Sequence, residues 1–244
     1  MPLRPLIGVL GGMGPLATVD FLHKLVTSTP AMRDQDHVPT VVWNVPQIPD
    51  RQKALAGLGP TPLPAMLEGI ERLNAAGATR IIIPCNTAHI WFNDLQAASA
   101  APILHIADAT IAALPADSGK VGLIATRGTL DAGLYQSRFQ SNGIDFIVQS
   151  DSEIEDLFVP GCYAIKENDL RRGGVLLETG ARRLIDRGAE RLVLACTEVP
   201  IGLSAIASDL LPVCIDPAQA LADACIRYWD DARERSPANV SVGQ

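Results

Sequence analysis

An internal repeat is the feature that most constrains how this chain can fold. Two segments, 76–87 and 187–198, align at a constant offset of 111 residues, and glycine, alanine, arginine and cysteine coincide in them. A second pair, 7–14 and 121–128, aligns at an offset of 114 residues. A sequence repeat of this kind indicates a repeated unit of structure. We therefore expect the chain to consist of two similar halves.

Short apolar runs alternate with segments of helical periodicity in the first half. Strand-like runs cover 6–10, 40–45 and 80–84, and the helical patterns cover 16–26 and 63–73. Strand and helix in alternation predict a parallel sheet with helices on both faces and right-handed crossovers. The predicted fold class is therefore α/β, with two pseudo-symmetric lobes and an active site in the cleft between them.

The repeat also suggests where the lobes begin and end. The N-terminal α/β lobe is expected to span 1–115 and the C-terminal α/β lobe 116–216. A helix over 217–230 carries an apolar stripe and is expected to pack back on the first lobe. Residues 236–244 are expected to form a flexible tail.

Composition excludes several classes of function. A formal net charge of -7 provides no basic face for a nucleic acid. No run approaches the roughly 18 apolar residues of a membrane span, and the first residues do not resemble a signal peptide. We therefore expect a cytoplasmic protein with no nucleic-acid or membrane partner. Five cysteines without a CxxC pair indicate reduced thiols and no structural zinc site, and we predict no metal.

Two of the cysteines, Cys85 and Cys196, occupy equivalent positions at the ends of equivalent strands. Ligands of open parallel sheets bind beyond the carboxyl ends of the strands, so both thiols are expected to face one cleft. Racemisation requires a base on one face of the α-carbon and an acid on the other, which a thiolate and a thiol provide. Cys162, Cys214 and Cys225 lack this symmetry and are expected to be structural.

Polar residues follow each cysteine where the next helix is expected to begin. They are Asn86 and Thr87 in the first half, and Thr197 and Glu198 in the second. Hydroxyl and amide groups, together with the amides of a helix N-terminus, suit an α-carboxylate. We therefore predict that these residues bind substrate.

Other candidates lie in the turns and loops. The glycine turn 11–14 lacks a complete phosphate-binding motif and is expected to bring backbone amides and Met13 to the cleft. Thr126 lies in the equivalent turn of the second half and is a further binding candidate. His89 lies one turn after Cys85, where a capping or packing role is as plausible as catalysis.

Two cations are candidate anion clamps in this acidic protein. Arg51 offers a bidentate fork, and Lys166 offers a point charge. Gln52, beside Arg51, is included among the predicted binding residues.

The segments PCNTAH (84–89), ACTE (195–198) and GGMGP (11–15) resemble the aspartate racemase branch of the aspartate/glutamate racemase superfamily. The resemblance spans nearly the whole chain. It implies two pseudo-symmetric lobes, no cofactor, a homodimer, and two motif cysteines that form the acid/base pair.

Two further segments, 48–51 and 163–166, are also similar to this family. They imply that Arg51 and Lys166 receive the side-chain carboxylate of the substrate. Glu198 stands where glutamate racemases carry histidine, and Ala195 stands where the family usually has glycine.

The predicted function is cofactor-independent racemisation of an acidic amino acid, L-aspartate to D-aspartate, with Cys85 and Cys196 as the catalytic pair. Three alternatives stay open: a broader amino-acid racemase that includes glutamate, a related isomerase or decarboxylase with one reacting cysteine, and a non-catalytic paralogue that binds a small acid. The predicted substrate-binding residues are Met13, Arg51, Gln52, Asn86, Thr87, Thr126, Lys166, Thr197 and Glu198.

Overall fold

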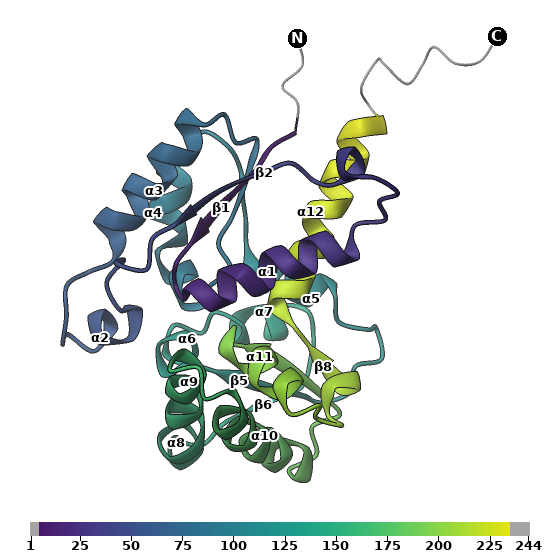
Figure 1. The fold of residues 1–244 in the computed structure, drawn as a ribbon. Helices are drawn as coiled ribbons and strands as arrows, with labels where there is room; N and C mark the ends of the chain where they lie inside the picture. Colours follow the sequence, from purple (N-terminus) through teal and green to yellow (C-terminus); the bar gives the residue numbers. More distant parts are fainter. Residues whose placement is uncertain (1–4, 235–244) are drawn as a thin grey trace.

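The computed structural model describes residues 5–234 as two lobes, each built on one sheet (Figure 1). The predicted tail, 236–244, lies outside the described residues. The first lobe contains, in chain order, β1 (Ile7–Gly11), α1 (Pro15–Ser28), the 3-10 turn η1 (Asp34–Asp36), β2 (Thr40–Asn44), α2 (Arg51–Leu55), α3 (Leu63–Ala75), β3 (Arg80–Ile82), the 3-10 turn η2 (Thr87–Trp91), α4 (Phe92–Ala98), β4 (Ile103–Leu104) and α5 (Ile106–Ala112).

The second part of the chain repeats this alternation of strands and helices. It contains β5 (Val121–Ala125), α6 (Arg127–Asp131), α7 (Gln136–Ser141), β6 (Phe146–Val148), α8 (Asp151–Glu153), the π-helical turn η3 (Ile154–Phe158), α9 (Val159–Lys166), α10 (Leu170–Asp186), β7 (Arg191–Ala195), α11 (Glu198–Ala205), the 3-10 turn η4 (Leu211–Val213), β8 (Cys214–Ile215) and α12 (Pro217–Glu234).

The two sheets have the same topology. Their strand orders are β2-β1-β3-β4 and β6-β5-β7-β8, and every neighbouring pair is parallel. The predicted α/β fold with two pseudo-symmetric lobes is therefore confirmed. None of the helices within 5–234 is long and apolar enough to cross a membrane.

The repeat has a packing explanation in each lobe. A Cβ atom at Gly8 of β1 would lie 2.9 Å from the Cβ of Ala78, and one at Gly122 of β5 would lie 3.1 Å from the Cβ of Ala189. Ala78 and Ala189 occupy the same position of the repeat. A larger side chain in the strand would push away the loop that follows the helix. The coinciding small residues therefore preserve the same close approach twice.

Side chains of the strands alternate between two apolar clusters, as expected for sheets buried on both faces. In β1, Ile7 and Val9 pack with residues of α1, α5 and α12, whereas Leu10 packs with α3. In β7, the methyl group of Ala195 joins Phe139 on the α7 side of the second sheet. The alanine at this position, where the family that the motifs resemble usually has glycine, is thus accommodated in the core.

Helix α12 follows the second sheet in the sequence but packs on the first lobe. It contacts α1 and α5, and in Figure 1 it is the yellow helix that crosses α1. Leu221 and Cys225 of α12 share a buried cluster with Ile7 and Phe21. The apolar stripe of this helix therefore covers one face of the first sheet, and Cys225 is a core residue.

The helices after the two cysteines differ from the symmetric expectation. The second begins at Glu198 as an α-helix, whereas the first opens with a 3-10 turn before α4. The backbone N–H of His89 donates to Asn86 O (3.0 Å) and not to Cys85 O. Cys85 O is in contact with Nδ1 of the His89 ring (2.9 Å). A side chain thus occupies the carbonyl that a regular α-helix would pair with its own backbone.

Candidate active site

A small polar pocket lies between the lobes, beyond the ends of β3 and β7. It contains about 380 Å³ of space free of protein atoms, part of it open to solvent. The described residues that line it are Met13, Asp50, Arg51, Gln52, Cys85, Asn86, Thr87, Thr126, Lys166, Cys196, Thr197 and Glu198. All eleven predicted site residues are present in this lining, and Asp50 is an addition. The structure therefore brings the whole predicted set together.

Cys85 follows β3 in a tight turn, where its N–H donates to Ile83 O (2.8 Å). Its side chain is buried. Burial raises the pKa of the Cys85 thiol above its ordinary value, while the positive charge of Arg51 and the N–H of Ala88 act in the opposite direction. The ionised form of this thiol is thus disfavoured by desolvation and supported by a cation and an amide.

Cys196 has the same backbone geometry, because its N–H donates to Leu194 O (2.8 Å). Its surroundings are different. The thiol donates to Glu198 Oε2 (3.0 Å), and its sulfur lies 3.8 Å from that of Cys162. The neighbouring Cys162 thiol, burial and the Glu198 carboxylate all raise the pKa of Cys196, which lies well above its ordinary value. Cys196 is therefore a protonated thiol near neutral pH.

Lys166, at the end of α9, places its ammonium group 3.9 Å from Glu198 Oε1. Burial lowers the pKa of Lys166, but the neighbouring acidic groups, with Glu198 first among them, together outweigh burial, and the pKa lies above its ordinary value. Lys166 is therefore charged. The lysine side chain is 42% exposed, so this long ion pair contributes little stability and leaves donors for a ligand.

Arg51 opens the short helix α2, which Asp50 caps by accepting the N–H of Gln52 (2.8 Å). The guanidinium Nη1 donates to the carbonyl oxygens of Ile48 (3.2 Å) and Pro49 (2.9 Å). Its Nε is buried without a partner. The preceding loop therefore fixes one side of the guanidinium group, which retains donors for an anion.

Hydroxyl and amide groups join the lobes at the edge of the pocket. Gln52 Nε2 donates to Thr87 Oγ1 (3.2 Å), and Gln52 Oε1 accepts the N–H of Gly128 (3.2 Å). Thr87 Oγ1 also lies 3.0 Å from Thr126 Oγ1 and 3.2 Å from Thr129 Oγ1. Both ends of the Gln52 amide are thus engaged, so this residue bridges the lobes besides lining the pocket.

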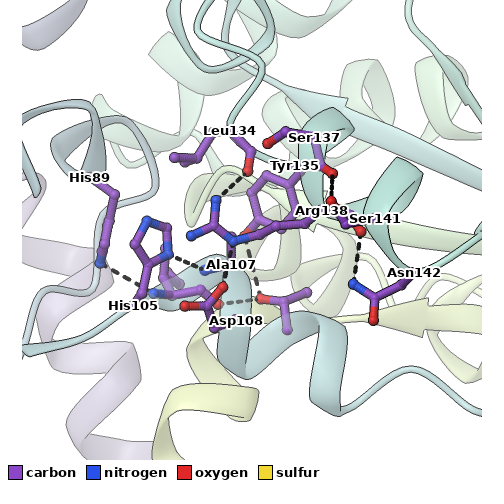
Figure 2. A network of polar contacts seen from close by, with 12 residues as sticks. His89, His105, Ala107, Asp108, Leu134, Tyr135, Ser137, Arg138, Ser141 and Asn142 are labelled. Carbon is purple, nitrogen blue, oxygen red and sulfur yellow. Dashed lines mark hydrogen bonds and ion pairs between the residues drawn. The ribbon is translucent and has the colours of Figure 1, made fainter.

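Asn86 is held by a residue of the second lobe. The hydroxyl of Tyr135 donates to Asn86 Oδ1 (2.5 Å), while Asn86 Nδ2 is buried without a partner. Burial raises the pKa of Tyr135, so its hydroxyl keeps its proton. Figure 2 shows the Tyr135 side chain within a larger polar network. The unpaired amide group makes Asn86 a ready donor for a carboxylate.

His89 links the Cys85 turn to α5, and Figure 2 shows its side chain next to that of His105. Its Nδ1 lies 2.9 Å from Cys85 O, and its Nε2 accepts the N–H of Ile106 (3.2 Å). The first contact requires a protonated Nδ1, and the second requires a bare Nε2, so the ring is neutral. Burial lowers the pKa of His89 to about 4. His89 therefore positions the turn by packing and hydrogen bonding.

Sequence reasoning missed three residues of the site. Asp50 lies in the pocket wall, Tyr135 fixes Asn86, and Cys162 contacts Cys196 although we expected it to be structural. The spacing carried a signal for Cys162, because it precedes Lys166 by four residues and such pairs share a helix face. Among residues 5–234, no group of three or more His, Cys, Asp and Glu is arranged to hold a metal ion.

The fold and the site define a two-lobed α/β protein with a small polar pocket to which both lobes contribute. Two cysteine thiols, an arginine and a lysine line this pocket. The chain belongs to the Asp/Glu/hydantoin racemase family, whose model matches residues 10–225. The resemblance noted in the motifs is thus confirmed.

Individual relatives agree with this assignment. An aspartate racemase from Picrophilus torridus is 31% identical, covers 94% of this chain and 98% of its own, and superposes with a TM-score of 0.83. The broad-specificity amino-acid racemase RacX of Bacillus subtilis is 28% identical over 92% of this chain and 98% of its own length. A Francisella tularensis glutamate racemase in complex with D-glutamate is 18% identical, covers 97% of this chain and 85% of its own, and has a TM-score of 0.71, which shows a shared fold.

Proposed function

We propose that this chain racemises an acidic amino acid, with aspartate as the preferred substrate, by moving the α-proton between Cys85 and Cys196. The observation that supports it is the shared pocket: two thiols from equivalent strand ends of two lobes line one small space. Inversion at the α-carbon by proton transfer needs one proton carrier on each face of that carbon. Two pseudo-symmetric lobes can provide one carrier each.

The chemical environments of the two thiols suggest their starting roles. Cys85, whose thiolate is supported by Arg51, removes the α-proton, and the electron pair remains on the α-carbon as a carbanion. Cys196, held as a thiol beside Glu198, donates its proton to the opposite face. Cys85 ends as the thiol and Cys196 as the thiolate, so the reverse reaction exchanges the roles. The proton transfer itself requires no cofactor.

The remaining lining residues suit a dicarboxylate. In this proposal the unpaired amide of Asn86, with Thr87 and Thr197, receives the α-carboxylate. Arg51 and Lys166 receive the side-chain carboxylate, Arg51 as a fork and Lys166 as a point charge. Met13 and Thr126 form part of the wall. The aspartate racemase of P. torridus supports this choice of substrate by its similarity along nearly the whole chain.

A broader amino-acid racemase is the second candidate. The carboxylates of Asp50 and Glu198 lie in the same lining as Arg51 and Lys166, so two negative charges formally balance two positive ones. A site without net positive charge also accommodates an amino acid with a neutral side chain. The similarity to RacX of B. subtilis over nearly its full length supports this alternative.

Optical activity tests the proposal directly. The purified chain is mixed with L-aspartate without added pyridoxal phosphate, and circular dichroism is followed with time, in parallel with D-aspartate, L-glutamate and L-alanine. We expect both aspartate enantiomers to reach the racemate, faster than glutamate or alanine. Equal rates for aspartate and alanine would favour the broader racemase, and no change with any amino acid would leave only a binding protein. The homodimer and the cytoplasmic location stay predictions.

A further inference from the structure

Two thiols lie side by side at one end of the pocket. The sulfur atoms of Cys162 and Cys196 are 3.8 Å apart, each residue is 7% exposed, and neither forms a disulfide. Cys162 comes from α9 and Cys196 from the turn after β7, so two separate elements bring them together. Sulfur atoms at this distance are in contact, and a small movement of the side chains brings them within bonding range.

The two thiols differ in access to the pocket. Cys196 belongs to the pocket lining, whereas Cys162 does not. Cys162 lies behind it, in a buried apolar cluster with Phe158, Ile165 and Leu177. A small molecule that enters the pocket therefore meets Cys196 first, with Cys162 already next to the sulfur it has modified.

We infer that Cys162 and Cys196 form an oxidative modification site, at which a hydroperoxide converts the pair into a disulfide. The Cys196 thiolate attacks hydrogen peroxide, the O–O bond breaks, and Cys196 becomes a sulfenic acid while water is released. The Cys162 sulfur then attacks the Cys196 sulfur, the S–S bond forms, and a second water leaves. One peroxide is reduced to two waters while two thiols are oxidised.

The consequence for racemisation rests on the proposed function, because the disulfide removes Cys196 as a proton carrier. Reduction by a dithiol restores both thiols and with them the reaction. Cys162 thus protects Cys196 from further oxidation to the sulfinic acid, which thiols do not reverse. Cys85 is a free cysteine, and among residues 5–234 the thiol contact is the one between Cys162 and Cys196, so we expect Cys85 to form no such disulfide.

The rate of this modification depends on pH. The Cys162 thiol and burial raise the pKa of Cys196, so little of the thiolate that attacks peroxide is present at neutral pH, and its fraction grows as the pH rises. We therefore expect disulfide formation to accelerate from neutral to alkaline pH.

The test uses the full, reduced chain treated with hydrogen peroxide, followed by alkylation, intact-mass measurement and non-reducing peptide mapping. We expect the loss of two hydrogen atoms, a cross-link between the peptides that contain Cys162 and Cys196, and a loss of racemisation that dithiothreitol reverses. Cys162→Ser and Cys162→Ala should form no cross-link, and in excess peroxide their Cys196 should instead gain two oxygen atoms as a sulfinic acid that dithiothreitol does not reduce. Cys214→Ser removes a thiol elsewhere and should behave as the wild type does.

Three results would overturn the inference: a cross-link between other cysteines, a disulfide between two chains, or no more sulfinic acid at Cys196 in the two Cys162 variants than in the wild type under excess peroxide. Peptide mapping reads the cross-link without reference to catalysis. A chain that forms it but racemises no amino acid would therefore overturn the proposed function alone.

Discussion

The turns that carry Cys85 and Cys196 share a backbone hydrogen bond and differ in their electrostatic surroundings. Each cysteine N–H bonds to the carbonyl two residues earlier at 2.8 Å, and each turn follows the strand next to β1 or β5. Arg51 acts on the first thiol, whereas the second donates to a carboxylate and touches another thiol.

The difference between the turns arises at positions that the repeat does not conserve. Two residues after the cysteine, the first turn has Thr87 and the second has Glu198. Four residues after it, His89 ties the first turn to α5, and Pro200 stands at the equivalent position. The repeated elements thus account for the placement of the two thiols, and the positions that differ between the halves account for their unequal chemistry.

The largest expected effect comes from removing either thiol. Cys85→Ser and Cys196→Ser should each slow racemisation on the order of 10³-fold, because a serine hydroxyl is a far weaker base than a thiolate. Steady-state rates from each aspartate enantiomer measure the effect. Cys225→Ser, on the buried face of α12, is the matched control for loss of a buried thiol. Full activity in either Cys85→Ser or Cys196→Ser would show that racemisation does not need both thiols.

The two cations are expected to act on substrate affinity. Arg51→Ala should raise KM for aspartate on the order of 10- to 100-fold, the range for loss of a charge-assisted hydrogen bond. KM for alanine, which lacks the second carboxylate, should change far less. Lys166→Ala should act in the same direction and more weakly, because Lys166 is already close to Glu198. Equal effects on both substrates would remove the clamp from the proposal.

Glu198→Gln tests the difference in charge between the turns. After Cys162 and burial, the Glu198 carboxylate is the group that raises the pKa of Cys196. Without that charge the pKa of Cys196 falls, and Cys196 loses its proton at a lower pH. When Cys196 acts as the acid, kcat/KM falls at alkaline pH as Cys196 loses its proton. In Glu198→Gln this fall should occur at a pH about one unit lower. An unchanged pH profile would show that Glu198 does not control this thiol.

The smallest effect is expected from Tyr135→Phe, which removes the hydroxyl that holds Asn86. Loss of a neutral hydrogen bond corresponds to about a fivefold rise in KM. In an Asn86→Ala background the same change should have no further effect, because Tyr135 acts through Asn86. Tyr228→Phe, on α12, controls for removal of a tyrosine hydroxyl. Equal costs in both backgrounds would indicate a merely structural role.

The sequence predicted the parts of the molecule that repeat. The strand ends carrying both cysteines, and the small residues Gly8 and Ala78 that pack at the first sheet, belong to a pattern that occurs twice. The two-residue strands β4 and β8 were not predicted, because segments this short carry no periodicity.

Contacts between elements that are distant in the sequence could not be predicted either. The bond between Asn86 and Tyr135 crosses from one lobe to the other, and the Cys162 contact depends on where α9 lies after the π-helical turn. Local patterns specify an element and its buried face. They do not specify which side chain of another lobe will meet it.

Hydrogen exchange at the α-carbon is the most direct test of two thiols acting from opposite faces. L-aspartate and D-aspartate are incubated separately with the chain in deuterium oxide, and the enantiomer and its deuterium content are determined together. The account predicts that the inverted product carries solvent deuterium at Cα in both directions and that neither single-cysteine variant forms it at an appreciable rate. An inverted product that retains its original α-hydrogen would contradict the account.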